Sequence, residues 1–212
     1  MTSALNSISP LIHLVDDDAA VREGLARLLA TVGLRTVSWS LPQEFLSGVD
    51  RAAVGAVVLD ARMPGLSGLA VLEQLKSAGI EQPVIMLTGH GTVDMCRRAF
   101  KAGAVEFLEK PVDDQQLIDA VHAAVSQHVR SRAREVAGRE VRERFARLSV
   151  RESEVLRLMV TGQTSKQIGR SLGLSPRTVE THRSNLSAKL ESESLAQLIT
   201  QYAALIDEQA EP

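Results

Sequence analysis

Short apolar runs alternate with amphipathic stretches through the first 125 residues of the chain. Five runs have the length of buried strands, and each is followed by a stretch whose apolar positions recur at helical spacing. The predicted strands are 11–15, 36–39, 54–59, 83–87 and 105–108, and the predicted helices are 21–33, 42–49, 67–79, 92–103 and 113–125. Because strands and helices alternate, the pattern predicts an α/β domain with a doubly wound, five-stranded parallel sheet.

Beyond residue 148 the pattern changes to short helices with clear N-terminal signals. Two capping boxes, each a serine or threonine followed three residues later by glutamate or glutamine, begin at Ser149 and Thr164. Ser175 precedes a proline, which suits the start of a third helix. A tight turn, Leu-Gly-Leu-Ser, separates the predicted helices 165–172 and 176–190, which is the spacing of a helix-turn-helix.

The segment between these two regions has no proline and a single glycine, Gly138. Apolar residues at helical spacing continue from 121 to 136 and start again, out of register, at Val141. We therefore expect a long helix that is bent or interrupted near Gly138, with room for only a short coiled coil. The predicted domains are 1–125, a helical linker at 126–147, and a small all-α domain at 148–212 that ends in an amphipathic helix (195–206) and a frayed tail (207–212).

Composition narrows the class of protein. Hydrophobic residues make up 44% of the 212 residues, which is enough to bury a core. The single cysteine, Cys96, excludes an internal disulfide framework and a cysteine-built zinc site. No apolar run approaches about 20 residues and the N-terminal segment lacks a signal-peptide pattern, so we expect a cytoplasmic protein without membrane association.

The net charge of −2 conceals an asymmetry between the two halves of the chain. Residues 1–125 hold 15 acidic and 10 basic side chains, whereas residues 126–190 hold 6 acidic and 14 basic ones. An acidic module joined to a basic one suits a protein with a DNA-binding segment, although solvated helix surfaces give similar counts.

Polar side chains follow four of the predicted strands. They are Asp16, Asp17 and Asp18 after the first strand, Asp60 after the third, Thr88 after the fourth and Lys110 after the fifth. The carboxyl ends of parallel strands meet at one edge of the sheet, where such folds bind ligands, and carboxylates gathered there favour a hard cation such as Mg²⁺. Asp60 is a candidate nucleophile because carboxylates form acyl phosphates, and Thr88 and Lys110 can bind phosphate oxygens.

Four motifs, LVDDD, VVLDARMPGLSG, IMLTGHG and GAVEFLEKP, make residues 8–125 resemble the receiver domain of two-component response regulators, a flavodoxin-like fold. The resemblance implies that Asp60 is the phospho-acceptor and that Mg²⁺ is held by Asp16, Asp17, Asp60 and the backbone carbonyl of Arg62. It also implies a switch pair, Thr88 and Phe107, a phosphate-binding lysine, Lys110, and a cis peptide bond before Pro111.

The predicted helix 176–190 has one apolar stripe, formed by Val179, His182, Leu186 and Leu190 when residues advance by about 100° each. The opposite side carries polar side chains that can reach base edges, since arginine prefers guanine and glutamate accepts from cytosine. The predicted base-reading residues are Arg177, Glu180, Thr181 and Ser184, and the predicted phosphate contacts are Lys166, Arg183 and Lys189. Thr178 is a further predicted DNA-binding residue.

Residues 148–190, and above all SPRTVETHRSNLSAKL, resemble the LuxR-type DNA-binding domain of FixJ- and NarL-like regulators. Two departures are Ser165, where the family usually has asparagine, and Gly169, where alanine is common. Gly169 is expected to cost about 0.5–1 kcal/mol of helix stability relative to alanine.

Together the two resemblances imply a transcription regulator and not an enzyme, apart from Mg²⁺-dependent phospho-acceptance and self-dephosphorylation on Asp60. They imply that a sensor histidine kinase supplies the phosphoryl group and that the phosphorylated protein forms a homodimer. The dimer would bind double-stranded promoter DNA, with RNA polymerase as a further partner. A two-fold dimer suits DNA because one small helix-turn-helix reads too few bases.

Two other functions fit some of the same residues. A haloacid-dehalogenase-like phosphatase would use Asp16 as nucleophile and Asp18 as acid/base, but Ala20 stands where that family has threonine or valine. A constitutive DNA-binding protein would keep the receiver for protein contacts alone, although all five chemical positions of the receiver are present.

Overall fold

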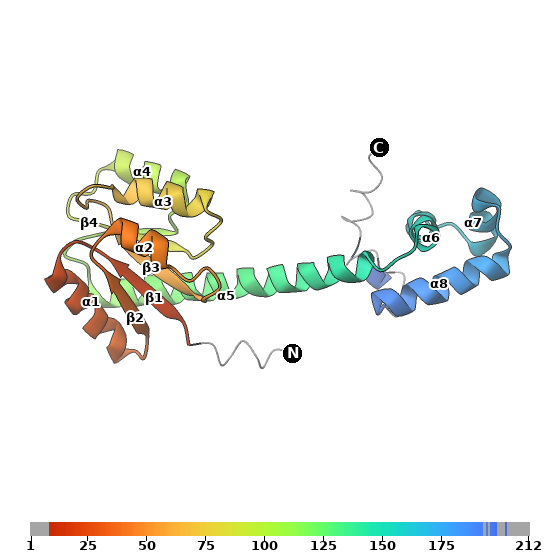
Figure 1. Ribbon diagram of the computed structural model, residues 1–212, viewed down its shortest axis with the longest axis horizontal. Helices are drawn as coiled ribbons and strands as arrows, with labels where there is room; N and C mark the ends of the chain where they lie inside the picture. The colour runs from red at the N-terminus through yellow and green to blue at the C-terminus, as the bar shows by residue number, and fades with distance from the viewer. Residues whose placement is uncertain (1–8, 193, 195, 199–201, 203–212) are drawn as a thin grey trace. The chain divides into compact units, whose positions relative to one another are not determined.

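The computed structural model describes residues 9–192, 194, 196–198 and 202, and Figure 1 draws the rest of the chain as a grey trace. The chain forms two compact units that meet between Arg132 and Ala133. The predicted C-terminal helix at 195–206 lies largely outside the described residues, and the predicted tail at 207–212 lies entirely outside them. No helix in the described part of the chain is long and apolar enough to cross a membrane.

The N-terminal unit is the predicted doubly wound sheet. Its five parallel strands lie in the order β2-β1-β3-β4-β5. The strands are β1 (Leu11–Val15), β2 (Arg35–Trp39), β3 (Gly55–Asp60), β4 (Val84–Thr88) and β5 (Glu106–Glu109). The helices are α1 (Ala19–Thr31), α2 (Pro42–Gly48), α3 (Gly68–Ser77), α4 (Val93–Ala102) and α5 (Asp114–Phe145). All ten elements were predicted from the sequence, and the strand boundaries differ by one residue at most.

Helices cover both faces of the sheet, with α1 and α5 on one side and α2, α3 and α4 on the other (Figure 1). The central strand β3 shows how the sequence fills both faces, since its side chains alternate between them. Val57 and Leu59 pack with Phe45 of α2 in one apolar cluster, whereas Val58 packs with Leu117 of α5 in the other. Every residue of β3 is buried, as expected for the middle of a parallel sheet.

The helix α5 continues from the N-terminal unit into the linker, as the sequence pattern predicted. It runs from Asp114 to Phe145 and is not interrupted at Gly138, so the predicted interruption there is wrong. A single glycine weakens a helix by only about 1 kcal/mol, and the flanking residues are good helix formers. The part of α5 before residue 133 belongs to the N-terminal unit, because the buried ring of His128 lies 3.0 Å from the carbonyl oxygen of Gly55 in β3.

The C-terminal unit contains α6 (Val150–Val160), α7 (Ser165–Leu172) and α8 (Pro176–Leu190). Both predicted capping boxes are present, at Ser149 and Thr164, and the Ser175 side chain caps α8. The predicted apolar stripe of α8 is buried at three positions, Val179, Leu186 and Leu190, while His182 is half-buried. Val179, Leu186 and Leu190 share a core with Phe145, Val155, Leu156, Met159, Ile168, Leu198 and Tyr202.

Gly169 has a packing role that the sequence did not reveal. A Cβ atom at this position would lie 2.6 Å from the carbonyl oxygen of Leu174, closer than van der Waals contact permits. The glycine therefore lets the turn between α7 and α8 approach the helix backbone, where Leu174 N–H donates to the Gly169 carbonyl at 2.8 Å.

Candidate functional sites

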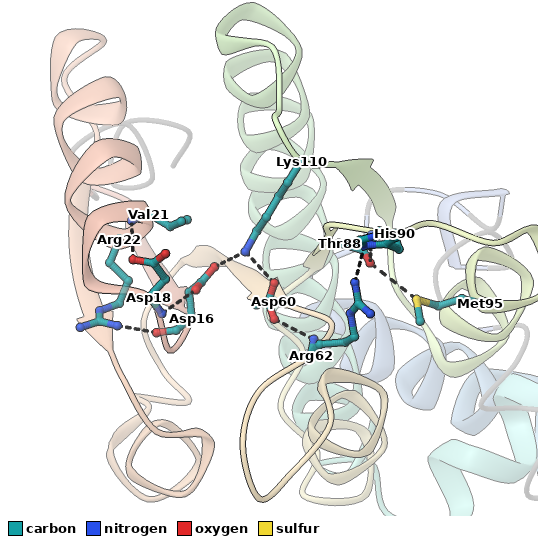
Figure 2. Close-up of polar contacts among 10 residues, drawn as sticks. All are labelled: Asp16, Asp18, Val21, Arg22, Asp60, Arg62, Thr88, His90, Met95 and Lys110. Atoms are coloured by element: carbon teal, nitrogen blue, oxygen red, sulfur yellow. Dashed lines mark hydrogen bonds and ion pairs between the residues drawn. The ribbon is translucent and has the colours of Figure 1, made fainter.

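The carboxyl ends of β1 and β3 bring two buried carboxylates together. Val15 pairs with Leu59 across these strands, so Asp16 and Asp60 follow at neighbouring positions. Asp16 is 3% exposed and Asp60 is 5% exposed. Lys110, which follows β5, reaches between them: its Nζ lies 2.5 Å from Asp16 Oδ2 and 2.6 Å from Asp60 Oδ1 (Figure 2). We refer to Asp16, Asp60 and Lys110 as the strand-end cluster.

The strand-end cluster holds more negative than positive charge. Burial lowers the pKa of Lys110, but its hydrogen bonds to Asp16 and Asp60 outweigh this effect and hold the pKa above its ordinary value. The lysine is therefore protonated at neutral pH, and one ammonium group faces two carboxylates. The uncompensated negative charge makes this edge attractive to a cation.

The three consecutive aspartates have three different environments. Asp16 Oδ1 accepts from the N–H of Asp18 at 2.9 Å, which fixes the carboxylate at the strand end. Asp18 itself caps α1, because its Oδ1 accepts from the N–H of Ala20 at 2.8 Å. Asp17 lies between them with an exposed side chain. Asp18 could therefore bind a ligand only by giving up its capping contact with α1.

A hard divalent cation at the strand-end cluster would need backbone oxygens as ligands in addition to carboxylates. No group of three or more histidine, cysteine, aspartate or glutamate side chains in the described part of the chain is arranged to hold a metal ion. Asp16 and Asp60 supply two buried oxygen donors with uncompensated charge, which is the donor chemistry that Mg²⁺ prefers. The N–H of Arg62 donates to Asp60 Oδ2 at 2.7 Å, so the backbone of Arg62 is held beside the same carboxylate.

The predicted switch residues lie beside the strand-end cluster, and the carbonyl oxygen of Thr88 accepts from the N–H of Lys110 at 2.7 Å. Thr88 is 1% exposed, and its hydroxyl donates to Met95 Sδ of α4 at 3.8 Å and accepts from the N–H of His90 at 3.3 Å (Figure 2). Phe107 of β5 is half-buried against the apolar cluster on the α2–α4 side of the sheet. The peptide bond between Lys110 and Pro111 is cis, as the resemblance implied.

One contact beside the cluster was not predicted. The side chain of Arg62 reaches His90, with Nη2 at 2.7 Å from Nδ1, and so links the loop after β3 to the loop after β4 (Figure 2). The resemblance to receivers implied a role only for the backbone carbonyl of Arg62. No spacing rule connects residues 62 and 90, so this contact could not have been found without the fold.

The α7–α8 face presents most of the predicted DNA contacts to solvent. Six of the eight predicted residues are exposed: Lys166, Arg177, Thr178, Glu180, Thr181 and Ser184. Arg183 and Lys189 are half-buried, and each already has an acidic partner in α8 or α6. The exposed set offers the mixture of cationic, hydroxyl and carboxylate groups that can read base edges.

Lys189 is paired with the buried carboxylate of Glu152, which the sequence pattern indicated only as part of a capping box. Its Nζ lies 2.6 Å from Oε2 of Glu152, which is 3% exposed, and the same oxygen accepts from the N–H of Ser149 at 2.7 Å. Burial raises the pKa of Glu152, but the hydrogen bonds from Lys189 and Ser149 outweigh it and hold the pKa below its ordinary value. The phosphate contact predicted for Lys189 therefore competes with an ion pair inside the C-terminal unit.

Comparisons with known proteins agree with both units. Residues 12–122 match the response regulator receiver domain, and residues 146–202 match the luxR family of bacterial regulatory proteins. The chain is 43% identical to the transcriptional regulatory protein FixJ of Azorhizobium caulinodans over 89% of each chain. It is 38% identical to the response regulator protein TodT of Pseudomonas putida, over 89% of this chain and 83% of TodT.

Solved structures give the same result. The response regulator StyR matches with a TM-score of 0.85 at 37% identity, over 92% of this chain and 99% of StyR. Full-length FixJ from B. japonicum matches with a TM-score of 0.58 at 35% identity, over 93% of this chain and 97% of that chain.

The sheet with its acidic edge and the helix-turn-helix define a protein that joins a receiver domain to a DNA-binding domain. The chain belongs to the two-component response regulators that carry a LuxR-type DNA-binding domain, and it is a transcriptional regulator. The phosphatase alternative is set aside, because the matched family consists of transcriptional regulators and not of enzymes of that class.

Proposed function

We propose that Asp60 is the phospho-acceptor and that a sensor histidine kinase is the phosphoryl donor. The observation that supports this most directly is the strand-end cluster, in which a buried carboxylate on the central strand faces a second carboxylate and a lysine. A carboxylate oxygen of Asp60 attacks the phosphorus of a phosphohistidine. The new O–P bond forms as the P–N bond breaks, and the imidazole of the kinase leaves.

Lys110 and the backbone beside Asp60 prepare the site for this transfer. The ammonium group of Lys110 lies within 2.6 Å of Asp60 Oδ1 and is placed to stabilise the charge that develops on the phosphoryl oxygens. The Arg62 N–H holds the other oxygen of Asp60, which limits rotation of the carboxylate. Lys110 then becomes the binding partner of the phosphoryl group.

Mg²⁺ is the proposed cofactor. Asp16, Asp17, Asp60 and the backbone carbonyl of Arg62 would hold it, and it would neutralise negative charge on the phosphoryl oxygens during phosphorylation and during self-dephosphorylation. The Asp17 side chain is exposed, whereas Asp18 is bound to the first turn of α1. Phospho-acceptance and self-dephosphorylation on Asp60 are the only reactions that we propose for this site.

The switch acts through Thr88 and Phe107. A phosphoryl group on Asp60 adds charge and three acceptor oxygens, which draw the Thr88 hydroxyl away from Met95 and inward. The space that Thr88 leaves admits the half-buried ring of Phe107. The surface around α4 and β5 changes in consequence and forms the homodimer.

The dimer places two copies of α8 on promoter DNA in the cytoplasm. Arg177, Glu180, Thr181 and Ser184 read bases, Lys166, Arg183 and Lys189 approach phosphates, and Thr178 also contacts the DNA, with RNA polymerase as a further partner. We assign residues 1–125 to the receiver, 126–147 to a helical linker and 148–212 to the DNA-binding domain.

The test is intact mass spectrometry of the full chain after incubation with acetyl phosphate and Mg²⁺, with gel filtration of the same samples. We expect the wild-type protein to gain one phosphoryl group and to form a larger species, and Asp60→Asn to do neither. If no adduct forms under conditions that phosphorylate a control receiver, the proposal is wrong. A constitutive DNA-binding protein would then be the better description.

A further inference from the structure

Three polar side chains of the helix-turn-helix form a closed network. Ser165 is the first residue of α7, and its hydroxyl donates to Oε1 of Glu180 in α8. The same hydroxyl accepts from Nη1 of Arg183 at 2.7 Å. Arg183 Nη1 also lies 3.5 Å from Glu180 Oε1. The network thus joins the start of α7 to the first half of α8 through side chains alone.

The network leaves one carboxylate oxygen available. Oε1 of Glu180 takes both contacts, and no residue in the described part of the chain donates a hydrogen bond to Oε2. The Glu180 side chain is 61% exposed, whereas the Arg183 side chain is 34% exposed. The acceptor therefore faces solvent while its positioning partners are more covered.

Charge explains why a carboxylate is tolerated on this face. DNA phosphates repel an isolated glutamate, so an acidic side chain beside the duplex normally costs affinity. Pairing with Arg183 cancels the charge of Glu180 and occupies one cation that would otherwise be free to approach phosphate. The pair adds little net attraction to DNA, and what it adds is a fixed acceptor.

We infer that Ser165 and Arg183 are positioning residues that hold Glu180 so that its free oxygen reads the exocyclic amino group of a cytosine in the major groove. A carboxylate only accepts hydrogen bonds. Guanine and thymine present acceptors in the major groove, and adenine presents the acceptor N7 beside its amino group, whereas cytosine presents the N4 donor without an adjacent acceptor. The inference rests on the proposed role of α8 in reading DNA, and it reassigns Arg183 from phosphate contact to positioning.

The experiment uses the full chain, phosphorylated with acetyl phosphate and Mg²⁺ and incubated with a pool of randomised double-stranded DNA whose bound fraction is sequenced. We expect the wild-type protein to select cytosine at one position of each half-site. Glu180→Gln should change this selection to adenine, because glutamine bonds both N6 and N7 of adenine. Ser165→Ala should keep cytosine but lower the preference about two- to tenfold, which corresponds to one lost hydrogen bond.

Two further variants serve as controls. Glu154→Gln removes a carboxylate from a similar ion pair with Arg151 on α6 and should leave the selected sequence unchanged. Ser165→Thr retains the hydroxyl and should retain the wild-type preference. Thermal unfolding of every variant shows whether the C-terminal unit is intact, so that altered reading is separated from lost folding.

Arg183→Gln distinguishes positioning from phosphate contact. If Arg183 positions Glu180, the preference for cytosine falls while the slope of log affinity against log salt concentration stays at the wild-type value. Loss of a phosphate contact would lower the magnitude of that slope by about one.

Three results would overturn the inference: unchanged selection by Glu180→Gln, unchanged preference in Ser165→Ala, or a salt slope reduced by about one in Arg183→Gln. A wild-type protein that binds the pool without any preferred sequence would instead contradict the proposed function.

Discussion

Each unit of this protein contains a buried carboxylate beside a lysine. The two arrangements differ in the number of partners that balance the charge of each carboxylate and donate hydrogen bonds to it. In the N-terminal unit one lysine, Lys110, is shared between Asp16 and Asp60. In the C-terminal unit Lys189 serves Glu152 alone, and the capping box of Ser149 supplies a further hydrogen bond. The first arrangement retains negative charge for a ligand or a reaction, whereas the second is a complete structural pair.

The difference shows that burial of an acid does not by itself mark a reactive site. Glu152 and Asp60 are nearly equally buried, at 3% and 5% exposure. What separates them is the balance of partners, because a buried ion pair with all its hydrogen bonds made has no remaining demand for a cation. Variants at the two sites and the response of each unit to pH should separate the two arrangements, and a fourth prediction concerns the packing of the C-terminal unit.

The largest effect is expected at the structural pair. Glu152→Ala leaves Lys189 without its partner and removes one half of the capping box, so the C-terminal unit should lose about 2–3 kcal/mol of unfolding free energy. Urea unfolding followed by circular dichroism measures this loss. A change below about 0.5 kcal/mol would mean that the pair behaves as a surface ion pair.

A smaller effect of opposite sign is expected at the strand-end cluster. Asp60→Asn removes one of two carboxylates that compete for Lys110, so the N-terminal unit should keep its unfolding free energy or gain up to about 1 kcal/mol. The same variant loses phosphorylation. Destabilisation as large as that of Glu152→Ala would show that Asp60 is as structural as Glu152, and the comparison would fail.

The two units should also respond differently to pH. The pKa of Glu152 is lower in the folded protein than its ordinary value of 4.5, so its contribution to stability is present above that value and is lost as pH falls through the folded pKa. The pKa of Lys110 is raised from 10.5, so its contribution is present below that value and is lost as pH rises through the folded pKa. The unfolding free energy of the wild type and of Glu152→Gln should be measured between pH 3 and 7. We expect it to fall less steeply with decreasing pH in the variant, because the variant lacks about one proton linked to unfolding.

The smallest effect is expected at Gly169. Gly169→Ala improves the helix propensity of α7 by about 0.5–1 kcal/mol. The added Cβ would lie 2.6 Å from the Leu174 carbonyl oxygen, so this carbonyl must move. The two effects oppose each other, and we expect a net loss of less than about 1 kcal/mol in urea unfolding of the C-terminal unit. Stabilisation by the full helix-propensity gain would show that the turn moves freely.

Much of the fold was predictable because its signals are local. The strands and helices of the N-terminal unit follow from runs and periodicities a few residues long, and the caps at Ser149, Thr164 and Ser175 follow from side chains that bond within three residues. The candidate site was predictable as a set of strand ends, because parallel strands bring their carboxyl ends to one edge. The resemblance to receivers then suggested a role for each residue, and those roles stay predictions until the phosphorylation experiment is made.

The remaining features depend on contacts between residues far apart in the chain. Nothing in the run Asp16, Asp17, Asp18 distinguishes a residue that pairs with Lys110 from one that caps α1. Nor does the spacing of polar residues in α8 show that Lys189 reaches Glu152, 37 positions earlier. Partners of this kind are set when elements pack, and the sequence pattern of one helix carries no information about the other.

The sequence by itself therefore determined the elements, their alternation, their caps and the residue types gathered at the sheet edge, because these depend on neighbours within a few positions. Only the tertiary structure decided how each charged group is used: Lys110 shared between two acids, Lys189 bound to one, and Arg183 linked to Ser165 and Glu180. The physical reason is that hydrogen bonding and ion pairing act over about 3 Å in space, and chain distance does not limit which groups meet at that range.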